Sequence, residues 1–318
     1  MTVGDTSAVP ENAAAFSVAT PDGAVLPVYA FGGPAHAPGL LFGHANGLAA
    51  GSYAPWLHEL AGALRIFAFD ARGHGGSRWP VGAFEAVFAV DRFADDLARV
   101  AAAVAARLDG APLSYAGHSL NAAAALLLAT CGAPLPWSGT ILFEPPVFPP
   151  PDSPHYAEAC EKQMPLITRS ATRRSVWPSP AALGEVLRAR GMFARFRPDL
   201  LAAHCHATLR PRAEGGFTLC CPPEVESAIF RIHRAADTWQ RLPAARAAIH
   251  LVASDAALPD RGWVSACMPD MAAQLPQARL TRLAGTGHMM IFEQPDRCRD
   301  LLLAALATDS SHATNTWA

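Results

Sequence analysis

The segment Gly117-His118-Ser119-Leu120-Asn121 places a serine where two patterns of the chain meet. The apolar run 113–116 before it resembles a buried strand, and the alanine- and leucine-rich run 120–131 after it resembles a helix. A sharp turn from strand to helix exposes the serine oxygen at a helix N-terminus, where backbone N–H groups favour negative charge. The pattern therefore predicts a nucleophilic Ser119, although a G-x-S triplet alone also fits a simple helix cap.

His288 ends the segment Gly285-Thr286-Gly287-His288, which lies between an expected strand at 278–283 and an expected helix at 291–307. A serine hydroxyl is a weak nucleophile until a base removes its proton, and histidine changes its protonation state near neutral pH. We therefore expect His288 to act as the general base.

A carboxylate must hold the imidazole in the right tautomer and stabilise its cation. Asp255, just beyond the expected strand 249–254, is the favoured candidate. Glu144, at the end of the expected strand 140–144, is the first alternative, and Asp260, in the same loop as Asp255, is the second. The residues alone leave the three open.

Short apolar runs alternate with longer helical ones along most of the chain. Strands that are apolar on both faces and alternate with helices predict an α/β fold with a mostly parallel sheet covered on both sides. Pro21-Asp22-Gly23 predicts an opening hairpin that supplies an antiparallel edge. The expected strands are 16–20, 24–31, 39–44, 65–70, 113–117, 140–144, 249–254 and 278–283, and the expected helices are 53–63, 92–108, 120–131, 262–274 and 291–307.

The alternation stops between Pro145 and Pro243, where helical pieces punctuated by proline take over. Many prolines and few large aliphatic residues predict a lid over the strand ends rather than an independent domain. Its expected helices are 156–168, 180–190, 198–210 and 223–241, with a short hairpin around 214–216. The expected organisation is a flexible N-terminus 1–14, a core of 15–145 and 244–308, a helical lid 146–243, and a flexible C-terminus 309–318.

In order and type, four motifs resemble those of the α/β-hydrolase superfamily, in its cap-bearing serine hydrolase branch. They are Gly43-His44-Ala45-Asn46-Gly47, Asp70-Ala71-Arg72-Gly73-His74-Gly75, Gly117-His118-Ser119-Leu120-Asn121 and Gly285-Thr286-Gly287-His288. The resemblance runs from about Phe16 to Ala307 and implies a doubly wound, eight-stranded sheet with a helical lid inserted after strand 6. Ala45 and Asn121 stand where the family has glycine; asparagine tolerates unusual backbone angles, so we expect the turn to survive.

The resemblance also assigns the oxyanion hole to the backbone N–H groups of Leu120 and Asn46. It implies that His44, Arg72 and His74 brace the active-site loops, and that no cofactor is needed. His204-Cys205-His206 carries metal-ligand residue types, but neighbours on a helix point in different directions, so we expect no metal site.

Composition limits the partners of the chain. A net charge of −2 without blocks of like charge gives no footprint for nucleic acid or an anionic membrane. The longest apolar stretch, 122–130, is far shorter than the ~20 residues of a membrane span, and residues 1–12 lack a signal-peptide pattern. Seven cysteines without framework spacing favour a reducing compartment. We expect a cytoplasmic protein, and a homo-oligomer stays open.

These residues predict hydrolysis of an acyl bond of a small molecule through an acyl-enzyme. The apolar lid favours a carboxylic ester of a small or medium-sized uncharged substrate. Hydrolysis of a C–C bond in a diketone, of a thioester or of an amide would use the same groups. The remaining alternative is a non-catalytic ligand-binding homologue, against which the intact Ser119 and His288 argue.

Overall fold

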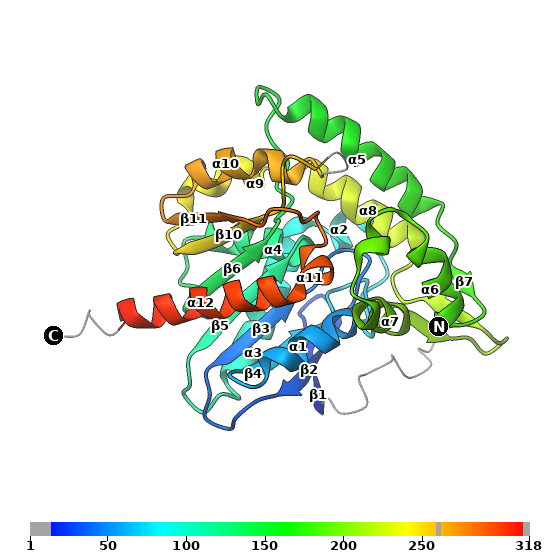
Figure 1. Ribbon diagram of the computed structural model, residues 1–318, viewed down its shortest axis with the longest axis horizontal. Helices are drawn as coiled ribbons and strands as arrows, with labels where there is room; N and C mark the ends of the chain where they lie inside the picture. Colours follow the sequence, from blue (N-terminus) through cyan, green and yellow to red (C-terminus); the bar gives the residue numbers. More distant parts are fainter. Residues whose placement is uncertain (1–13, 259–261, 314–318) are drawn as a thin grey trace.

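A sheet of eight strands runs through the computed structural model, which describes residues 14–258 and 262–313 (Figure 1). Its order is β1-β2-β4-β3-β5-β6-β10-β11; β2 is antiparallel to β1 and β4, and the other neighbours are parallel. The strands are β1 Ala14–Ala19, β2 Val25–Gly32, β3 Gly39–Gly43, β4 Arg65–Phe69, β5 Leu113–His118, β6 Gly139–Phe143, β10 Ile249–Ala253 and β11 Ala278–Arg282. The predicted sheet is confirmed, and each strand ends within two residues of its expected bounds.

Two hydrophobic cores lie on opposite faces of the sheet because successive side chains of a strand alternate. In β3, Leu41 joins one core, whereas Leu40 and Phe42 join the other. Helices α3, α4 and α10 supply residues to the first core, and α1 and α12 to the second. Their bounds are α1 Ala54–Leu60, α3 Val90–Ala105, α4 Leu120–Ala129, α10 Val264–Gln274 and α12 Pro295–Ala313. The short α2 Phe84–Val87 and the 3₁₀ turn η1 Ala50–Tyr53 are absent from the prediction.

The expected helix 291–307 is two helices, α11 Met290–Glu293 and α12. Gln294 between them has φ −138° and ψ 59°, because a residue before proline avoids the helical region. Pro295 then begins α12, a position where its missing N–H costs nothing. Helix α12 continues to Ala313 and so extends into the segment 309–318, whose predicted flexibility stays a prediction.

Between β6 and β10 the chain forms a further group of elements, most of which lie on the right of Figure 1, while α9 (Thr238–Arg241) lies beside α10. We call residues 146–243 the insertion. It contains α5 Tyr156–Ala171, β7 Val176–Trp177, α6 Pro180–Arg188, η2 Gly191–Arg195, α7 Pro198–Ala207, β8 Leu209–Pro211, β9 Phe217–Leu219, α8 Pro223–Arg234, α9 Thr238–Arg241 and η3 Leu242–Ala244, whose last residue lies just past it. The expected hairpin around 214–216 joins β8 to β9, and β7 adds a third strand. The expected helix 223–241 is broken before Asp237, a residue type that favours helix N-termini over helix interiors.

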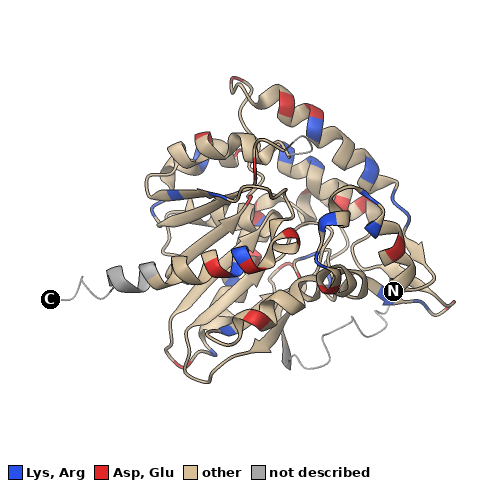
Figure 2. Cartoon of the chain, in the orientation of Figure 1, with Lys and Arg blue, Asp and Glu red and all other residues tan. Residues whose placement is uncertain are grey.

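The chain enters the insertion through two prolines, Pro145 and Pro146, which directly follow Glu144. Figure 2 shows basic and acidic residues interspersed along the outer helices. Among the described helices, none is both long and apolar enough to cross a membrane. Residues 1–13, 259–261 and 314–318 lie outside the described part of the chain, which includes most of the expected flexible N-terminus.

Candidate active site

Ser119 sits at the turn between β5 and α4, with backbone angles of φ 53° and ψ −112°. A positive φ is strained for a residue with a side chain, and such strain persists where the surrounding structure enforces it. The Ser119 N–H donates to the Phe143 carbonyl at 2.9 Å, which holds the turn on the neighbouring strand. Gly117 is required for a close approach, since a Cβ there would lie 2.9 Å from the Ala122 nitrogen.

Asn121 has a different role from the one expected for it. It lies within α4, so its backbone is helical, and the unusual angles of the turn belong to Ser119 instead. The Asn121 side-chain amide donates to the His44 carbonyl at 2.6 Å. Asn121 therefore joins the start of α4 to the loop after β3, a bond that glycine could not make.

Ser119, His288 and Glu144 form a continuous line of hydrogen bonds. The Ser119 Oγ lies 3.0 Å from His288 Nε2, and His288 Nδ1 lies 2.9 Å from Glu144 Oε2. The other carboxylate oxygen, Oε1, accepts the Ser254 N–H at 2.7 Å. Glu144 is fully buried, whereas the His288 side chain is 28% exposed, so the line runs from the interior towards the surface.

Asp255, the favoured acid, does not reach His288. Its carboxylate turns back to accept the N–H groups of Gly285 and Ala257, each at 2.8 Å. These two bonds hold the pKa of the Asp255 carboxyl below its usual range. The carboxylate on His288 comes instead from Glu144, which follows the adjacent strand β6. Asp260, the other alternative, lies outside the described residues.

The two residues expected to stabilise an oxyanion lie at the ends of neighbouring parallel strands, β3 and β5. Leu120 is the first residue of α4, so its N–H has no acceptor within the helix. Asn46 lies in the loop after β3, and its side-chain amide donates to the Glu226 carbonyl of α8 at 3.1 Å. The next residue, Gly47, has φ 76° and donates its N–H to His74 Nε2 at 3.0 Å.

The loops after β3 and β4 are joined by buried histidines, as the resemblance implies. His44 Nε2 accepts the Ala71 N–H at 3.0 Å, and the Nδ1 of His44 lies 2.8 Å from the Ala45 carbonyl. Burial lowers the pKa of His44, and burial together with the nearby His44 lowers the pKa of His74 to about 3. Both rings are therefore neutral at physiological pH and act as fixed hydrogen-bonding groups.

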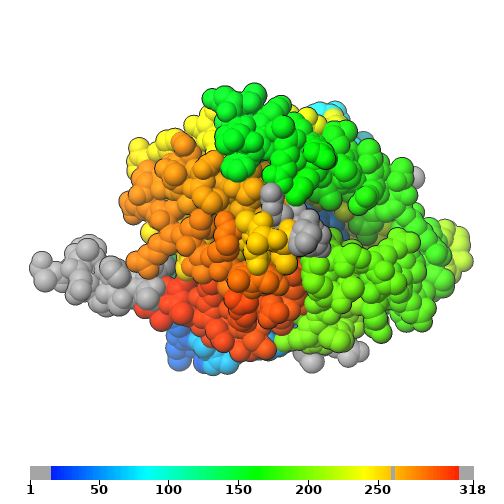
Figure 3. Space-filling model, turned by 45° about the horizontal axis from the view of Figure 1, so that its top comes forward, coloured from blue at the N-terminus to red at the C-terminus, as the bar shows by residue number. Residues whose placement is uncertain are grey.

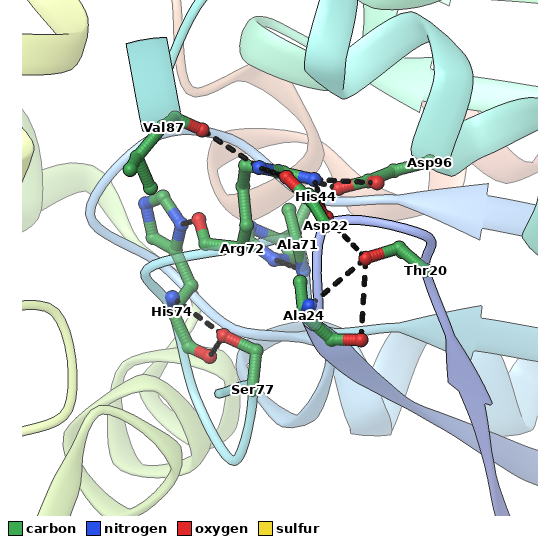
Figure 4. A network of polar contacts seen from close by, with 10 residues as sticks. All are labelled: Thr20, Asp22, Ala24, His44, Ala71, Arg72, His74, Ser77, Val87 and Asp96. Carbon is green, nitrogen blue, oxygen red and sulfur yellow. Dashed lines mark hydrogen bonds and ion pairs between the residues drawn. The ribbon is translucent and has the colours of Figure 1, made fainter. Parts of the chain in front are cut away.

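Arg72 anchors the loop after β4 to α3 (Figure 4). Its guanidinium binds both carboxylate oxygens of Asp96, at 2.7 and 2.8 Å. It also donates to Asp22 at 2.9 Å and to the Val87 carbonyl at 2.7 Å. Because Arg72 is only 1% exposed, this network is structural and does not face a substrate.

Charged side chains of the insertion rest on two loops of the site. Glu226, paired with Arg173, lies against Gly47, where a Cβ would come within 2.7 Å of its carboxylate. Arg195, paired with Glu293, lies against Gly287, where a Cβ would come within 2.8 Å of the guanidinium. In Figure 3 the yellow-green surface of the insertion adjoins the orange-red surface of α11 and α12.

Metal-ligand residue types are not grouped in the part of the chain that the structure describes: no three His, Cys, Asp or Glu side chains there are placed to hold a metal ion. In the His204-Cys205-His206 segment, His204 Nδ1 lies 3.4 Å from the Ser52 hydroxyl. Burial and the nearby Arg173 lower the pKa of His204 to about 3.

Sequence comparison identifies the family of this fold. The profile of the "Alpha/beta hydrolase family" matches residues 40–301, which span all four motifs. The chain belongs to this family. Comparison of this α/β hydrolase with curated proteins gives no match.

Solved structures share the fold of this α/β hydrolase at low sequence identity. E-2-(acetamidomethylene)succinate hydrolase is 18% identical with a TM-score of 0.76, over 93% of this chain and 100% of that one. The thioesterase domain from the curacin biosynthetic pathway is 18% identical with a TM-score of 0.70, over 92% and 100%. A thermophilic esterase from Thermogutta terrifontis is 21% identical with a TM-score of 0.62, over 94% and 99%.

Proposed function

We propose that this α/β hydrolase is a serine hydrolase that cleaves an acyl bond, in the first place a carboxylic ester of a small or medium-sized uncharged substrate. The observation that supports the proposal best is the line from Ser119 through His288 to Glu144, with its two hydrogen bonds of 3.0 and 2.9 Å. A nucleophile, a base and a carboxylate in this order form the arrangement that acyl transfer requires. Glu144 is the acid of the proposed triad, and Asp255 has no part in it.

In the proposed mechanism the Ser119 oxygen attacks the acyl carbon while His288 Nε2 takes the hydroxyl proton. The tetrahedral oxyanion accepts the N–H groups of Leu120 and Asn46. His288 then donates its proton to the leaving group, and the C–O bond of the ester breaks to give an acyl-enzyme. Water, deprotonated by His288, attacks the acyl-enzyme, and the proton returns to Ser119 as the acid product leaves.

Glu144 supports both protonation states of His288, the neutral ring and the imidazolium. Its Oε2 accepts the Nδ1–H, which leaves Nε2 free to take the Ser119 proton. The negative charge of a buried carboxylate is costly unless it is paired and hydrogen-bonded. The Ser254 N–H satisfies the second oxygen, and the imidazolium that forms during the reaction supplies the opposite charge.

The insertion is proposed to serve as the lid of the site. Its support is positional: Glu226 and Arg195 lie against the loops that carry Asn46 and His288. The structures of similar fold include an esterase and a thioesterase domain, so a thioester is an alternative to the carboxylic ester as substrate of this site.

A labelling experiment with a matched variant tests the serine mechanism. A fluorophosphonate probe should label the wild type and Ser17→Ala, whose serine is exposed on β1, but not Ser119→Ala. With p-nitrophenyl esters of graded acyl length, Ser119→Ala should lower kcat by at least ~10³-fold and keep the fold. Equal turnover by Ser119→Ala and the wild type would refute the mechanism. If Ser119 is labelled but no ester is hydrolysed, the bond that the enzyme cleaves would instead be a thioester, an amide or a C–C bond.

A further inference from the structure

A second chain of hydrogen bonds joins three loops of the site through Tyr53 and His118. The Tyr53 hydroxyl lies 3.3 Å from the Ala45 nitrogen and 2.7 Å from His118 Nδ1. His118 Nε2 lies 2.9 Å from the carbonyl oxygen of His288. Tyr53 and His118 are both completely buried, so water does not replace these bonds.

The direction of every hydrogen in this chain is determined by its two ends. The Ala45 N–H can only donate, so the Tyr53 oxygen accepts it and directs its own hydrogen to His118 Nδ1. The His288 carbonyl can only accept, so His118 carries its proton on Nε2. Burial, with a smaller contribution from His288, lowers the pKa of His118 to about 3, which keeps this ring neutral.

Each link of the chain ends at or beside a group of the proposed mechanism. Ala45 directly precedes Asn46, the proposed oxyanion donor, and His118 directly precedes Ser119. The carbonyl that His118 binds belongs to His288 itself. This chain of hydrogen bonds therefore connects the loop after β3, the end of β5 next to Ser119, and the loop after β11.

We propose that Tyr53 and His118 are positioning residues, which set the distance between the oxyanion donor and the base on either side of the nucleophile. This inference rests on the proposed serine hydrolase function. Errors of about 1 Å in the placement of reacting groups lower turnover by as much as ~10²-fold, so a buried strut between these loops bears directly on kcat.

The Tyr53 hydroxyl can be separated experimentally from the packing of its ring. The ring contacts Phe42 and Phe292, with centroid distances of 4.7 Å to each. Tyr53→Phe keeps these contacts and leaves the Ala45 N–H and His118 Nδ1 without a partner. Tyr29→Phe is the matched control: Tyr29 is buried and donates to Asp70 at 2.8 Å, but Asp70 also accepts two backbone N–H groups.

Kinetics on the best p-nitrophenyl ester give the first test. Tyr53→Phe should lower kcat by ~10- to 100-fold with KM within ~3-fold, and slow fluorophosphonate labelling in parallel, whereas Tyr29→Phe should keep the wild-type kcat. His118→Gln keeps a donor for the His288 carbonyl and His118→Phe does not, so their activities should rank in that order below the wild type. If the wild type is active and the kcat of Tyr53→Phe lies within twofold of it, the positioning role is wrong while the proposed function stands. If the wild type is inactive and is not labelled, both the positioning role and the proposed function are wrong.

The tautomer of His118 gives a second test that needs no turnover. In ¹⁵N spectra of the histidine ring nitrogens, the signals lost in His118→Gln belong to His118. They should report a neutral ring with the proton on Nε2 from pH 5 to 9. A His118 that is protonated on Nδ1, or that titrates within this range, contradicts the hydrogen-bond chain.

Discussion

Ser119 and Glu144 share an uncommon property, a positive φ in a residue that is not glycine. Each directly follows a parallel strand, β5 or β6, and each holds one end of the hydrogen-bonded line through His288. Such angles cost roughly 1–3 kcal/mol and persist only where the surrounding structure enforces them. The strained backbone of Ser119 and Glu144 thus accompanies the side-chain positions that bring both residues to His288.

The residue scale also carries the prediction that separates the two acids. Glu144 uses both carboxylate oxygens as acceptors, one for the Ser254 N–H and one for His288. A glutamine there turns an NH₂ group towards one of these two donors, so Glu144→Gln should lower kcat by roughly 10²- to 10⁴-fold. The carboxylate of Asp255 accepts the N–H groups of the loop residues Gly285 and Ala257 and does not reach His288, so Asp255→Asn should keep activity within ~3-fold.

Steady-state kinetics of both variants and of the wild type, with one ester, decide this. The folded fraction of each variant is checked by its thermal transition. If Asp255→Asn proves the more damaging of the two, the acid of the proposed triad is not Glu144.

The sequence shows why the acid is hard to assign at this scale. Glu144 and Asp255 follow the C-terminal ends of two adjacent strands, β6 and β10. Both residues therefore lie at the end of the sheet where His288 also lies. What separates them is side-chain direction, and Asp255 is turned away by two backbone donors that no spacing reveals. By contrast, the glycines around Ser119 and the element types on either side of it are visible in the sequence. The contacts of Tyr53 and His118 are not visible in the sequence, because they join residues that are far apart along the chain.

At the scale of elements, the Arg72 network joins the loop after β4 to α3 and to the β1–β2 turn. Asp96→Ala removes the bidentate partner and leaves the buried guanidinium, among the described residues, with Asp22 and the Val87 carbonyl. Breaking one side of a buried ion pair costs about 3–5 kcal/mol, so we expect a loss of about 3 kcal/mol in the free energy of unfolding.

Urea unfolding of Asp96→Ala checks this loss against Asp95→Ala, which removes the neighbouring exposed carboxylate of the same helix. Asp95→Ala should stay within ~0.5 kcal/mol of the wild type, as substitutions at exposed sites do. Equal stability of the two variants would show that the buried pair contributes nothing net.

Element boundaries follow the sequence closely in the sheet and less closely in the insertion. A buried parallel strand is recognised as a short continuous apolar run, and every strand of the eight-stranded sheet is found near its expected place. The breaks at Gln294 and before Asp237 interrupt apolar patterns that continue on both sides. Such patterns report which face is buried, and a helix can stop and restart without changing that face.

At the scale of the whole molecule, buried histidines couple stability to pH. Five histidines of the described chain are buried: His44, His74, His118, His204 and His233. Burial lowers the pKa from an ordinary value of 6.5 to about 3 for His74, His118 and His204 and to about 4 for His233. Burial also lowers the pKa of His44.

The sign of the effect follows from proton binding. Below pH 6.5 the unfolded chain takes up protons at these rings, while the folded chain does not until its lowered pKa values are reached. The stability should therefore be full above pH 6.5 and fall steadily between about pH 6.5 and 4, with each ring contributing at most about 1.4 kcal/mol per pH unit. Urea midpoints at pH 8, 7, 6 and 5 measure this. His233→Gln, which removes one such ring, should flatten the slope, and identical midpoints at pH 8 and 5 would contradict the account.

The two prolines that follow Glu144 have a mechanical consequence for any motion of the insertion. A proline fixes its own φ near −65°, so Pro145 and Pro146 form a short stiff arm beside the acid. Glu144 is clamped at its backbone by the Val252 carbonyl and at its side chain by Ser254 and His288. Rotation about φ is therefore restricted at this root of the insertion, and a motion of the proposed lid that begins beyond Pro146 would leave the Glu144 carboxylate in place.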